Sequence, residues 1–571
     1  MIQKLLVNHF NKYLNPNIYE ISLKINLYSP FFNFLSNKDF FDKIFTISIP
    51  TSEIEKYKSN KNHITEKFNI LNRTQSKYSS IEFYYNNTED IIFLKEFQIN
   101  FNHIKRLEIK QNKYNILFYY DYDYFFQTFF SLDNNIINNL VYLNIENKLR
   151  KIYIKLDLFE DINNFKSLEY LKLSFFDFKT DLTLKLFTLK EISLNYCDKI
   201  IFEENSLLKL KNLTFNNCIL NNREKPLIKL PLLERCSLIV FYGLDSSRQY
   251  NELIDFNSLK KLKYFEGEQH YFLLLKNKSL EKVKLISAYE SININGILQS
   301  VNEIEKRVIE KINSIETLKE IKIQLNKISN SDIAKIEGDN TSVENLKISF
   351  YGNTLGDHIL YFLQKKYPYL SSIKIWVKNN SNYNDNAELK IIENHDCIIK
   401  KIKLIYDEEY NLNLYFPSYE KIEEINLIIE NKYVNLNSFP IFSDKCKILF
   451  KSLTKFHLSL NNTKRKDILN NIYKNIDNMP NLKDFKIVCN TFCDKEEYYN
   501  LFIKKILSLK LIKRINIYIR DNDINEYYTK DELKRIYHEF NFLNFYEMII
   551  QKLKTPLLIL NQDSVSFCSL Y

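Results

Sequence analysis

Apolar residues recur along this chain in a fixed order, with one apolar residue, two variable residues, and then apolar residues at alternate positions. The pattern is clearest in residues 189–197, Leu-Lys-Glu-Ile-Ser-Leu-Asn-Tyr-Cys, and in residues 210–218, Leu-Lys-Asn-Leu-Thr-Phe-Asn-Asn-Cys. These two copies begin 21 residues apart, and the alternation within each has the period of two that is typical of a half-buried β-strand. A repeat this short cannot bury its apolar face alone, so we expect successive repeats to stack into a solenoid with one parallel sheet.

The same template fits about nineteen segments between Ile18 and Arg520. Between residues 168 and 280 the segments begin 21 to 26 residues apart, which leaves room for only a short 3₁₀ turn or loop between strands. From Val343 onward the spacing is mostly 23 to 31, which is enough for a return helix. Apolar residues at helical spacing predict helices over residues 301–315, 357–366, 467–476 and 496–509.

The pattern predicts three segments along the chain. Residues 1–17 are expected to form an N-terminal cap helix, residues 18–525 the solenoid, and residues 526–571 a C-terminal helical cap. The last of these depends on a helical pattern over residues 530–552, which would cover the unpaired backbone at the end of the sheet. The longest interval between repeats lies near residues 285–318, and it is a candidate position for a break in the solenoid.

Asn or Cys follows the last apolar position in many repeats, at Asn26, Asn86, Asn112, Cys197, Cys218, Asn326, Asn461 and Asn490. With the apolar spacing, this pattern resembles the leucine-rich-repeat superfamily, and the C-terminal half is similar to its ribonuclease-inhibitor-like class. The resemblance implies that these side chains satisfy backbone groups where each strand bends. Other residues stand at that place in several repeats: Phe176, Phe241, Tyr351, Lys378, Asp407 and Glu430. The resemblance therefore implies an α/β solenoid, an irregular leucine-rich-repeat arc with a parallel concave sheet and short loops or helices on the convex side.

The composition indicates an AT-rich genome, because the chain has 40 Tyr and 43 Phe against 6 Gly and 10 Pro. Tyr and Phe have AT-rich codons, whereas Gly and Pro have GC-rich ones. This bias, the irregular repeats and the lack of visible sorting signals are similar to the leucine-rich-repeat gene families of insect poxviruses and of divergent amoebal or microsporidian relatives. We therefore expect a viral or parasite protein.

The sequence predicts a cytoplasmic protein. Its first nine residues contain an apolar run of only three, so no signal peptide is expected. No stretch approaches the roughly 20 apolar residues of a membrane span. The 8 Cys residues form no CxxC motif, and Cys197 and Cys218 occupy the repeat's own position, which favours a reducing compartment.

A column of lysines is the candidate binding site. The residue between the second and third apolar positions of a repeat points away from the core, so these residues align on the concave face when strands stack. This residue is Lys in six successive repeats: Lys263, Lys284, Lys322, Lys347, Lys374 and Lys403. Such a column concentrates positive potential and predicts an acidic partner, with Trp376 beside it as a candidate anchor residue.

A structural interpretation of the same residues stays open. Lys is an AT-coded polar residue whose long stem covers sheet surface, and Glu320 and Glu424 on the same face can neutralise the column. For Trp376, partial burial at the edge of its repeat is the preferred interpretation.

The predicted function is a non-enzymatic protein–protein interaction scaffold that binds an acidic partner through the concave sheet. No cofactor and no metal are expected, because the sequence contains no glycine-rich phosphate loop, no HExxH motif and no His with metal-ligand spacing to Cys. One alternative is a substrate-selecting adaptor of a degradation or signalling complex, recruited by the apolar residues of segment 1–14. A second is nucleic-acid binding by the basic wall, although a formal charge of +10 over 571 residues does not favour it. The oligomeric state is left open.

Overall fold

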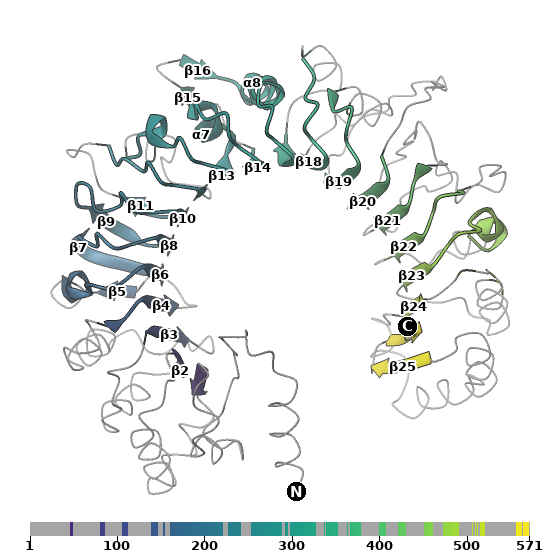
Figure 1. Ribbon diagram of the computed structural model, residues 1–571, viewed down its shortest axis with the longest axis horizontal. Coiled ribbons are helices and arrows are strands. Elements are labelled where there is room, and N and C mark those ends of the chain that lie inside the picture. Colours follow the sequence, from purple (N-terminus) through teal and green to yellow (C-terminus); the bar gives the residue numbers. More distant parts are fainter. Residues whose placement is uncertain are drawn as a thin grey trace, which may run out of the picture. The chain divides into compact units, whose positions relative to one another are not determined.

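The computed structural model describes residues 46–49, 80–85, 105–111, 139–146, 152–154, 160–220, 227–240, 250, 253–287, 292–294, 297–326, 336, 338–351, 363, 366–378, 399–406, 421–429, 450–460, 472–489, 505, 509, 511, 514–519, 556–561 and 564–569. The chain divides into two compact units. The N-terminal unit comprises residues 1–267 and 274–277, and the C-terminal unit comprises residues 268–273 and 278–571. Each contains a mainly parallel sheet whose strands follow one another in chain order (Figure 1).

In the N-terminal unit each strand of the main sheet pairs in parallel with the next one along the chain. The strands are β1 (Thr46–Ile49), β2 (Ser80–Tyr85), β3 (Arg106–Gln111), β4 (Tyr142–Glu146), β6 (Tyr170–Ser174), β8 (Glu191–Asn195), β10 (Asn212–Asn216), β12 (Arg235–Ile239) and β13 (Tyr264–Glu268). Paired apolar residues such as Ile192 and Leu213 are buried on one face. We call the other face of each main sheet its open face.

The return segments of the N-terminal unit form a second parallel sheet, which the sequence analysis did not predict. Its strands are β5 (Ile152–Ile154), β7 (Phe176–Leu184), β9 (Asp198–Phe202) and β11 (Ile219–Leu220). The 3₁₀ turns η5 (Glu160–Asn164) and η7 (Phe256–Ser258) are present as well. The expectation of turns or loops alone was wrong, because the returns pair as strands whose burial alternates: Ile200 and Phe202 are buried, and the equally apolar Ile201 between them is partly exposed.

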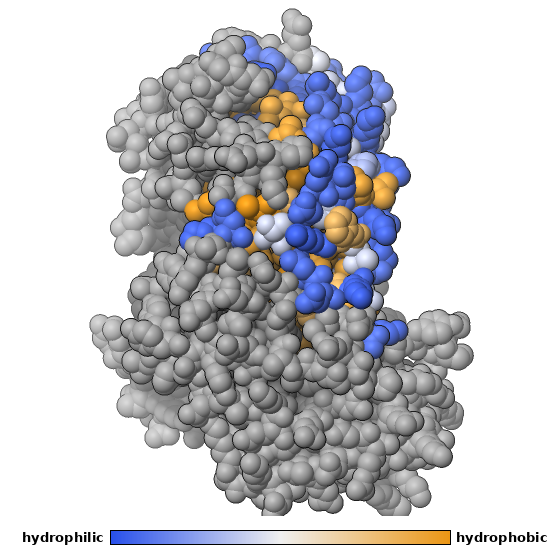
Figure 2. Space-filling view, turned by 90° about the vertical axis from the view of Figure 1, so that its left-hand side faces the viewer, coloured by the Kyte–Doolittle hydropathy of each residue, from blue (hydrophilic) through white to orange (hydrophobic). Residues whose placement is uncertain are grey.

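Figure 1 shows β7, β9 and β11 beside β6, β8 and β10, so the described returns lie on the core side of the main sheet. Seen from the side of these returns, the described surface mixes hydrophilic and apolar side chains (Figure 2).

Three successive bends between the two sheets, those after β6, β8 and β10, contain a residue with positive φ at the same place in the repeat. These residues are Phe175 (φ 67°), Tyr196 (φ 54°) and Asn217 (φ 53°). The thiol of Cys218 donates to the carbonyl oxygens of Leu194 (3.2 Å) and Asn216 (3.4 Å), and Cys197 makes the equivalent pair of contacts. Both cysteines thus satisfy backbone groups at a strand bend, as expected for this repeat position.

The C-terminal unit also has a main sheet in which each parallel strand pairs with the next. The strands are β14 (Lys282–Ile286), β17 (Glu320–Leu325), β18 (Asn345–Tyr351), β19 (Ser372–Lys378), β20 (Lys401–Tyr406), β21 (Glu424–Ile429), β22 (Lys455–Leu460), β23 (Asp484–Cys489) and β24 (Arg514–Ile519). A short antiparallel pair, β15 (Ile292–Ile294) and β16 (Ile297–Gln299), lies in the long interval after β14.

Near the end of the chain the structure has strands where a C-terminal helical cap was predicted. The strands β25 (Pro556–Asn561) and β26 (Ser564–Ser569) pair antiparallel with each other, and β26 pairs antiparallel with β24. The sequence Ser-Val-Ser-Phe-Cys-Ser of β26 alternates with period two, which favours a strand over a helix. Backbone pairing therefore covers this edge of β24. The predicted helix over 530–552 and the N-terminal cap over 1–17 lie outside the described residues.

The longest described helix, α8 (Val301–Asn313), falls within the predicted range 301–315. Its N-terminus is a capping box, in which Ser300 Oγ accepts from the Glu303 amide and the Glu303 carboxylate accepts from the Ser300 amide. Its apolar side, including Ile304 and Val308, is buried. Among the other predicted helices, residues 472–475 are helical and lead into the 3₁₀ turn η10 (Ile476–Asn478), while most of 357–366 and 496–509 lies outside the described residues.

The division between the two units lies at residues 267–278, before the interval 285–318 where the sequence suggested a break. The helix α7 (Gln269–Leu274) follows β13 directly. Its first residues belong to the C-terminal unit, where the Gln269 side chain donates to the carbonyl oxygen of Gln324 at 2.7 Å.

Candidate anion-binding surface

Strand pairing places five of the predicted lysines in one row on the open face of the C-terminal unit. Lys284 is paired with Lys322, Lys322 with Lys347, Lys347 with Lys374, and Lys374 with Lys403. The pairing runs without a register shift from β14 to β20, so successive lysines are spaced about 4.8 Å apart at the backbone. We call these five residues the lysine row.

Lys263 does not belong to the lysine row. It precedes β13, and the pairing of β13 with β12 places Glu266 opposite Ser237, at the position that the lysines occupy in later strands. The repeat starts at Leu262 instead of Leu259, since Phe265 and Gly267 occupy the two alternating core positions. Lys263 also lies in the N-terminal unit, whereas the lysine row lies in the C-terminal unit.

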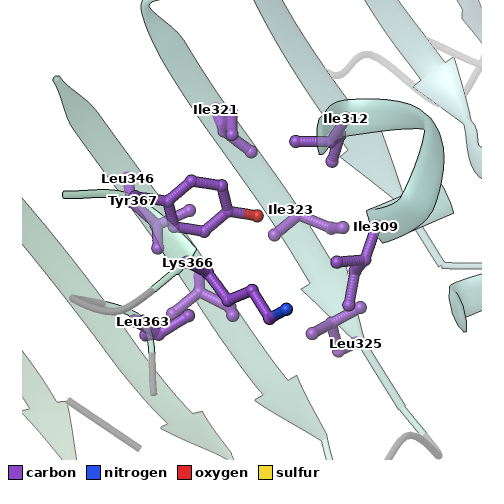
Figure 3. A pocket seen from close by; sticks show the side chains of 10 residues that line it. Ile309, Ile312, Ile321, Ile323, Leu325, Leu346, Leu363, Lys366 and Tyr367 are labelled. Atoms are coloured by element: carbon purple, nitrogen blue, oxygen red, sulfur yellow. The ribbon is translucent and has the colours of Figure 1, made fainter. Parts of the chain in front are cut away.

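The alternation of side chains explains why these lysines face solvent. Lys347 lies between the buried residues Leu346 and Ile348, and is itself exposed. Lys322 is exposed in the same way, and the other members of the row are partly exposed. Apolar residues of β17 and β18, such as Ile323 and Ile348, face α8, which packs on the opposite side of the sheet (Figure 3).

A second row of polar residues lies two positions earlier on the same five strands. It consists of Lys282, Glu320, Asn345, Ser372 and Lys401, which are also paired in register. Together the two rows contain seven lysines and one glutamate. The open face from β14 to β20 therefore carries a strong local excess of positive charge, although the whole chain carries only +10.

Glu320 is the one acidic residue in these two rows. Its carboxylate forms ion pairs with Lys282 at 2.8 Å and with Lys347 at 2.7 Å. Partial burial acts to raise the pKa of Glu320, but the hydrogen bonds and charges of the two lysines outweigh it and lower the pKa below its usual value. The neutralisation of the row by Glu320, which the sequence left open, is thus present at Lys347, the member of the row that Glu320 binds.

Lys374 experiences mainly the charges of other lysines. Partial burial lowers its pKa, and the charges of Lys403, Lys322 and Lys347 lower it further. Among the residues that the structure describes, no carboxylate lies within 4 Å of its ammonium group. An anion bound beside Lys374 would relieve this repulsion, so the most favourable position for a bound anion is on β18 to β20.

Trp376 lies beside the lysine row, two residues after Lys374 on β19. It is partly exposed and pairs in register with Ile405 on β20, which in turn pairs with Ile428 on β21. Ile428 is partly exposed, whereas Ile405 is buried. We call these three residues the apolar row. Only Trp376 was predicted from the sequence, although the position of the two isoleucines, two residues after the lysine position, was a usable signal for them as well.

The basic character ends after β20. The next residues in line with the lysine row are Asn426, His457 and Lys486. Acidic residues pair with basic ones here, since Glu424 lies 3.8 Å from Lys455 and Asp484 lies 3.5 Å from His457. The candidate site is therefore confined to five strands, β14 and β17 to β20.

The open face of the N-terminal unit has a different character. The buried Glu108 binds Arg106 at 2.6 Å and also pairs with Lys110, so its charge is compensated locally. Farther along, a shallow polar depression of about 360 Å³ lies on β8 to β13. Its lining residues are Glu191, Asn212, Leu213, Thr214, Asn216, Arg235, Cys236, Ser237, Ile239, Tyr264 and Glu266. Among the described residues of this face, there is therefore no counterpart of the lysine row.

The cavity beneath α8 is too small to hold a substrate. It measures about 10 Å³, and its walls come from α8, β17, β18 and the residues Leu363, Lys366 and Tyr367 (Figure 3), which leaves space for about one water molecule. The ammonium group of Lys366 donates to the carbonyl oxygens of Ile336 and Gly338, so backbone groups compensate this buried charge. Burial raises the pKa of the neighbouring Tyr367 hydroxyl.

In the described part of the chain, no group of three or more His, Cys, Asp or Glu residues is placed to hold a metal ion. None of the described helices is both long enough and apolar enough to cross a membrane. No protein-family model matches the chain, and no curated protein matches it significantly.

Proposed function

We propose that this protein is a non-enzymatic interaction module of the leucine-rich-repeat type that binds an acidic protein through the open face of its C-terminal unit. The observation that carries the proposal is the alignment of five lysines, without a register shift, on paired strands. The proposed contact residues are the lysine row and Trp376. The leucine-rich-repeat assignment is supported by the stacked parallel strands and by the thiols of Cys197 and Cys218 at the strand bends.

The physical basis is a preformed surface. A single exposed ion pair contributes at most about 1 kcal/mol, so useful affinity needs several lysines that act together. The backbones of β17 to β20 are already fixed by pairing on both sides, which reduces the ordering cost of binding. The excess positive charge also attracts acidic partners from solution and raises their association rate.

A protein partner is favoured over nucleic acid by two features of this surface. Its cations are all lysines, whereas arginine is the better residue for bidentate phosphate and base contacts. An apolar row that includes Trp376 lies directly beside the charged residues, and partly exposed aromatic side chains of this kind are typical anchors in protein interfaces. The adaptor alternative depends on segment 1–14, which lies outside the described residues.

Charge reversal on the lysine row tests the proposal. The probe is a fluorescein-labelled polyglutamate chain, and its binding to the full-length protein is followed by fluorescence anisotropy. We expect the triple variant K322E/K347E/K374E to lose at least about tenfold in affinity, equivalent to about 1.4 kcal/mol. The matched control K278E/K306E/K451E changes three exposed lysines of the same unit that lie outside both rows, and it should lose much less.

Two outcomes would overturn the proposal. If the triple variant and the control bind polyglutamate equally, the lysine row is not the binding surface. If single-stranded RNA of equal charge binds far more tightly than polyglutamate, with a steep loss of affinity as salt rises, the partner is nucleic acid.

A further inference from the structure

Two parallel rows of different chemistry lie side by side on the open face of the C-terminal unit. The lysine row crosses β14 to β20, and the apolar row crosses β19 to β21 at the next outward position along each strand. On β19 the two rows are adjacent at Lys374 and Trp376, and on β20 at Lys403 and Ile405. Both rows run perpendicular to the strands, so a segment that contacts both must also lie across the strands.

We infer that the partner binds this face with an amphipathic α-helix that lies across β18 to β21. The acidic stripe of this helix contacts the lysine row, and its apolar stripe contacts the apolar row. This inference rests on the proposed function and adds the conformation and the side-chain pattern of the bound segment.

The spacing of the lysine row fits one acidic residue per helical turn. Neighbouring lysines are about 4.8 Å apart at the backbone, and a helix rises about 5.4 Å per turn. Over the two intervals from Lys347 to Lys403 the mismatch is only about 1.2 Å, which flexible lysine side chains accommodate. In an extended segment, residues on one face repeat every 6.6–6.8 Å or so, and the mismatch over the same intervals reaches about 4 Å.

The backbone of the sheet gives a second argument against an extended partner. An extended peptide commonly binds by adding a strand to an open sheet edge. Strands β17 to β20 are each paired on both sides, so their edges are occupied. Only side chains are presented on this face, which favours a partner whose own backbone groups are already hydrogen-bonded, as in a helix.

The separation of the two rows matches two neighbouring stripes of one helix. Lys374 and Trp376 are two positions apart on a strand, about 6.7 Å. On a helix, acidic residues at i, i+4, i+7 and i+11 form one stripe, and apolar residues one position later form the next stripe around a body about 10 Å wide. Glu320 holds Lys347 at the β17 end, so the bound helix is centred on Lys374 and Lys403.

The experiment compares designed peptides on the full-length protein. The first is an 18-residue peptide, locked as a helix by a side-chain lactam, with Glu on one stripe and Leu on the neighbouring stripe. The second has the same composition in scrambled order, and labelled polyglutamate serves as the third probe. We expect the helical peptide to bind at least about tenfold more tightly than the scrambled peptide.

Variants of the apolar row complete the test. We expect W376A to weaken the helical peptide severalfold and to weaken polyglutamate, which has no apolar stripe, much less. I428N is a second variant, at a partly exposed position, and it should weaken the helical peptide in the same way. A thermal unfolding curve for each variant, compared with that of the wild type, checks that the variant is folded.

The outcomes separate this inference from the proposed function. If polyglutamate binds but the helical and scrambled peptides bind equally, or if neither apolar-row variant affects the helical peptide, the inference is wrong while the proposed function stands. If polyglutamate does not bind either, the proposed function itself fails.

Discussion

Glu320 on β17 binds Lys347 on the neighbouring strand β18 at 2.7 Å, and the same carboxylate also binds Lys282 on β14 at 2.8 Å. One carboxylate thus connects three adjacent strands on the face where an acidic partner is expected. It shows within the molecule the kind of contact that the partner would make, and it competes with the partner for Lys347.

Neutralising this carboxylate should strengthen anion binding. In the E320Q variant the lysines keep their places on paired strands, but the face loses a negative charge, so we expect severalfold tighter binding of polyglutamate at low salt. Thermal stability should change little, since exposed ion pairs contribute about 1 kcal/mol or less. Fluorescence anisotropy and a melting curve measure the two effects. E316Q, an exposed position outside both rows, is the control, and an equal gain in both variants would show that only net charge matters.

The pH dependence of stability should reveal the partly buried ammonium group of Lys311. It donates to the carbonyl oxygens of Phe272 (2.8 Å) and Leu273 (3.0 Å) in the last turn of α7. Burial, and then the charge of Arg307, lower the pKa of Lys311 from 10.5 to about 8. Between about pH 8 and pH 10.5 the folded protein has released a proton that the unfolded chain still binds, so this group makes the protein more stable as pH rises.

The measurement is the difference in unfolding free energy between the wild type and K311M, taken from denaturant curves at pH 7 to pH 10. We expect this difference to move in favour of the wild type above about pH 8, by up to about 1.4 kcal/mol per pH unit. The exposed Lys306 on the same helix provides the control K306M, which should show a flat difference. A flat or opposite slope for K311M would contradict the prediction.

Substitution of Gly267 should destabilise the N-terminal unit. A Cβ atom on this residue would lie 2.5 Å from the carbonyl oxygen of Leu238 and 3.1 Å from Cζ of Phe265. The first neighbour is backbone in a paired strand and cannot move easily, so G267A should cost about 1–3 kcal/mol in a denaturant titration.

Gly338 is a control in which a substitution strains the backbone but causes no steric clash. The nearest atom to its Cβ would be 3.7 Å away, but its φ is +85°, so G338A should cost about 1 kcal/mol through the backbone alone. A G267A variant as stable as the wild type would mean that β12 and β13 are not paired as described.

The cysteines of the N-terminal unit should be unreactive in the folded protein. Burial raises the pKa of the Cys197 and Cys236 thiols well above the usual value, and a protonated, buried thiol is a poor nucleophile. We expect no alkylation of either residue by iodoacetamide in the native protein, as read by mass spectrometry of tryptic peptides. All 8 Cys should react in guanidinium chloride. Rapid native modification of Cys197 would contradict the packing at the strand bend.

The lysine row could be predicted because its repeats keep apolar residues on both sides of each lysine. Lys347 between Leu346 and Ile348 is typical, and period-two alternation alone fixes its face. The prediction was wrong for Lys263, because the two core positions expected on either side of it, Leu262 and Tyr264, lie three residues later, at Phe265 and Gly267. A glycine in a core position carries no hydrophobic signal, and only pairing with β12 shows where the repeat begins.

The second sheet of the N-terminal unit could not be predicted from apolar alternation for a different reason. Strand β9 begins with Asp198, which is buried together with Ile200 and Phe202. The Asp198 carboxylate accepts a hydrogen bond from the Ile219 amide at 3.2 Å, so a polar residue occupies a core position with its hydrogen bond satisfied. The stabilising partner lies 21 residues away, in the next repeat, where a local pattern does not reveal it.

The unbroken pairing from β14 to β20 also limits how this protein can change over generations. An insertion of one residue inside any of these strands would turn its lysine toward the buried side and divide the charged face into two shorter pieces. Insertions in the connecting segments leave the alignment unchanged. Homologous chains that keep the same ligand should therefore vary in length between strands, while the number of residues within each of these five strands stays constant.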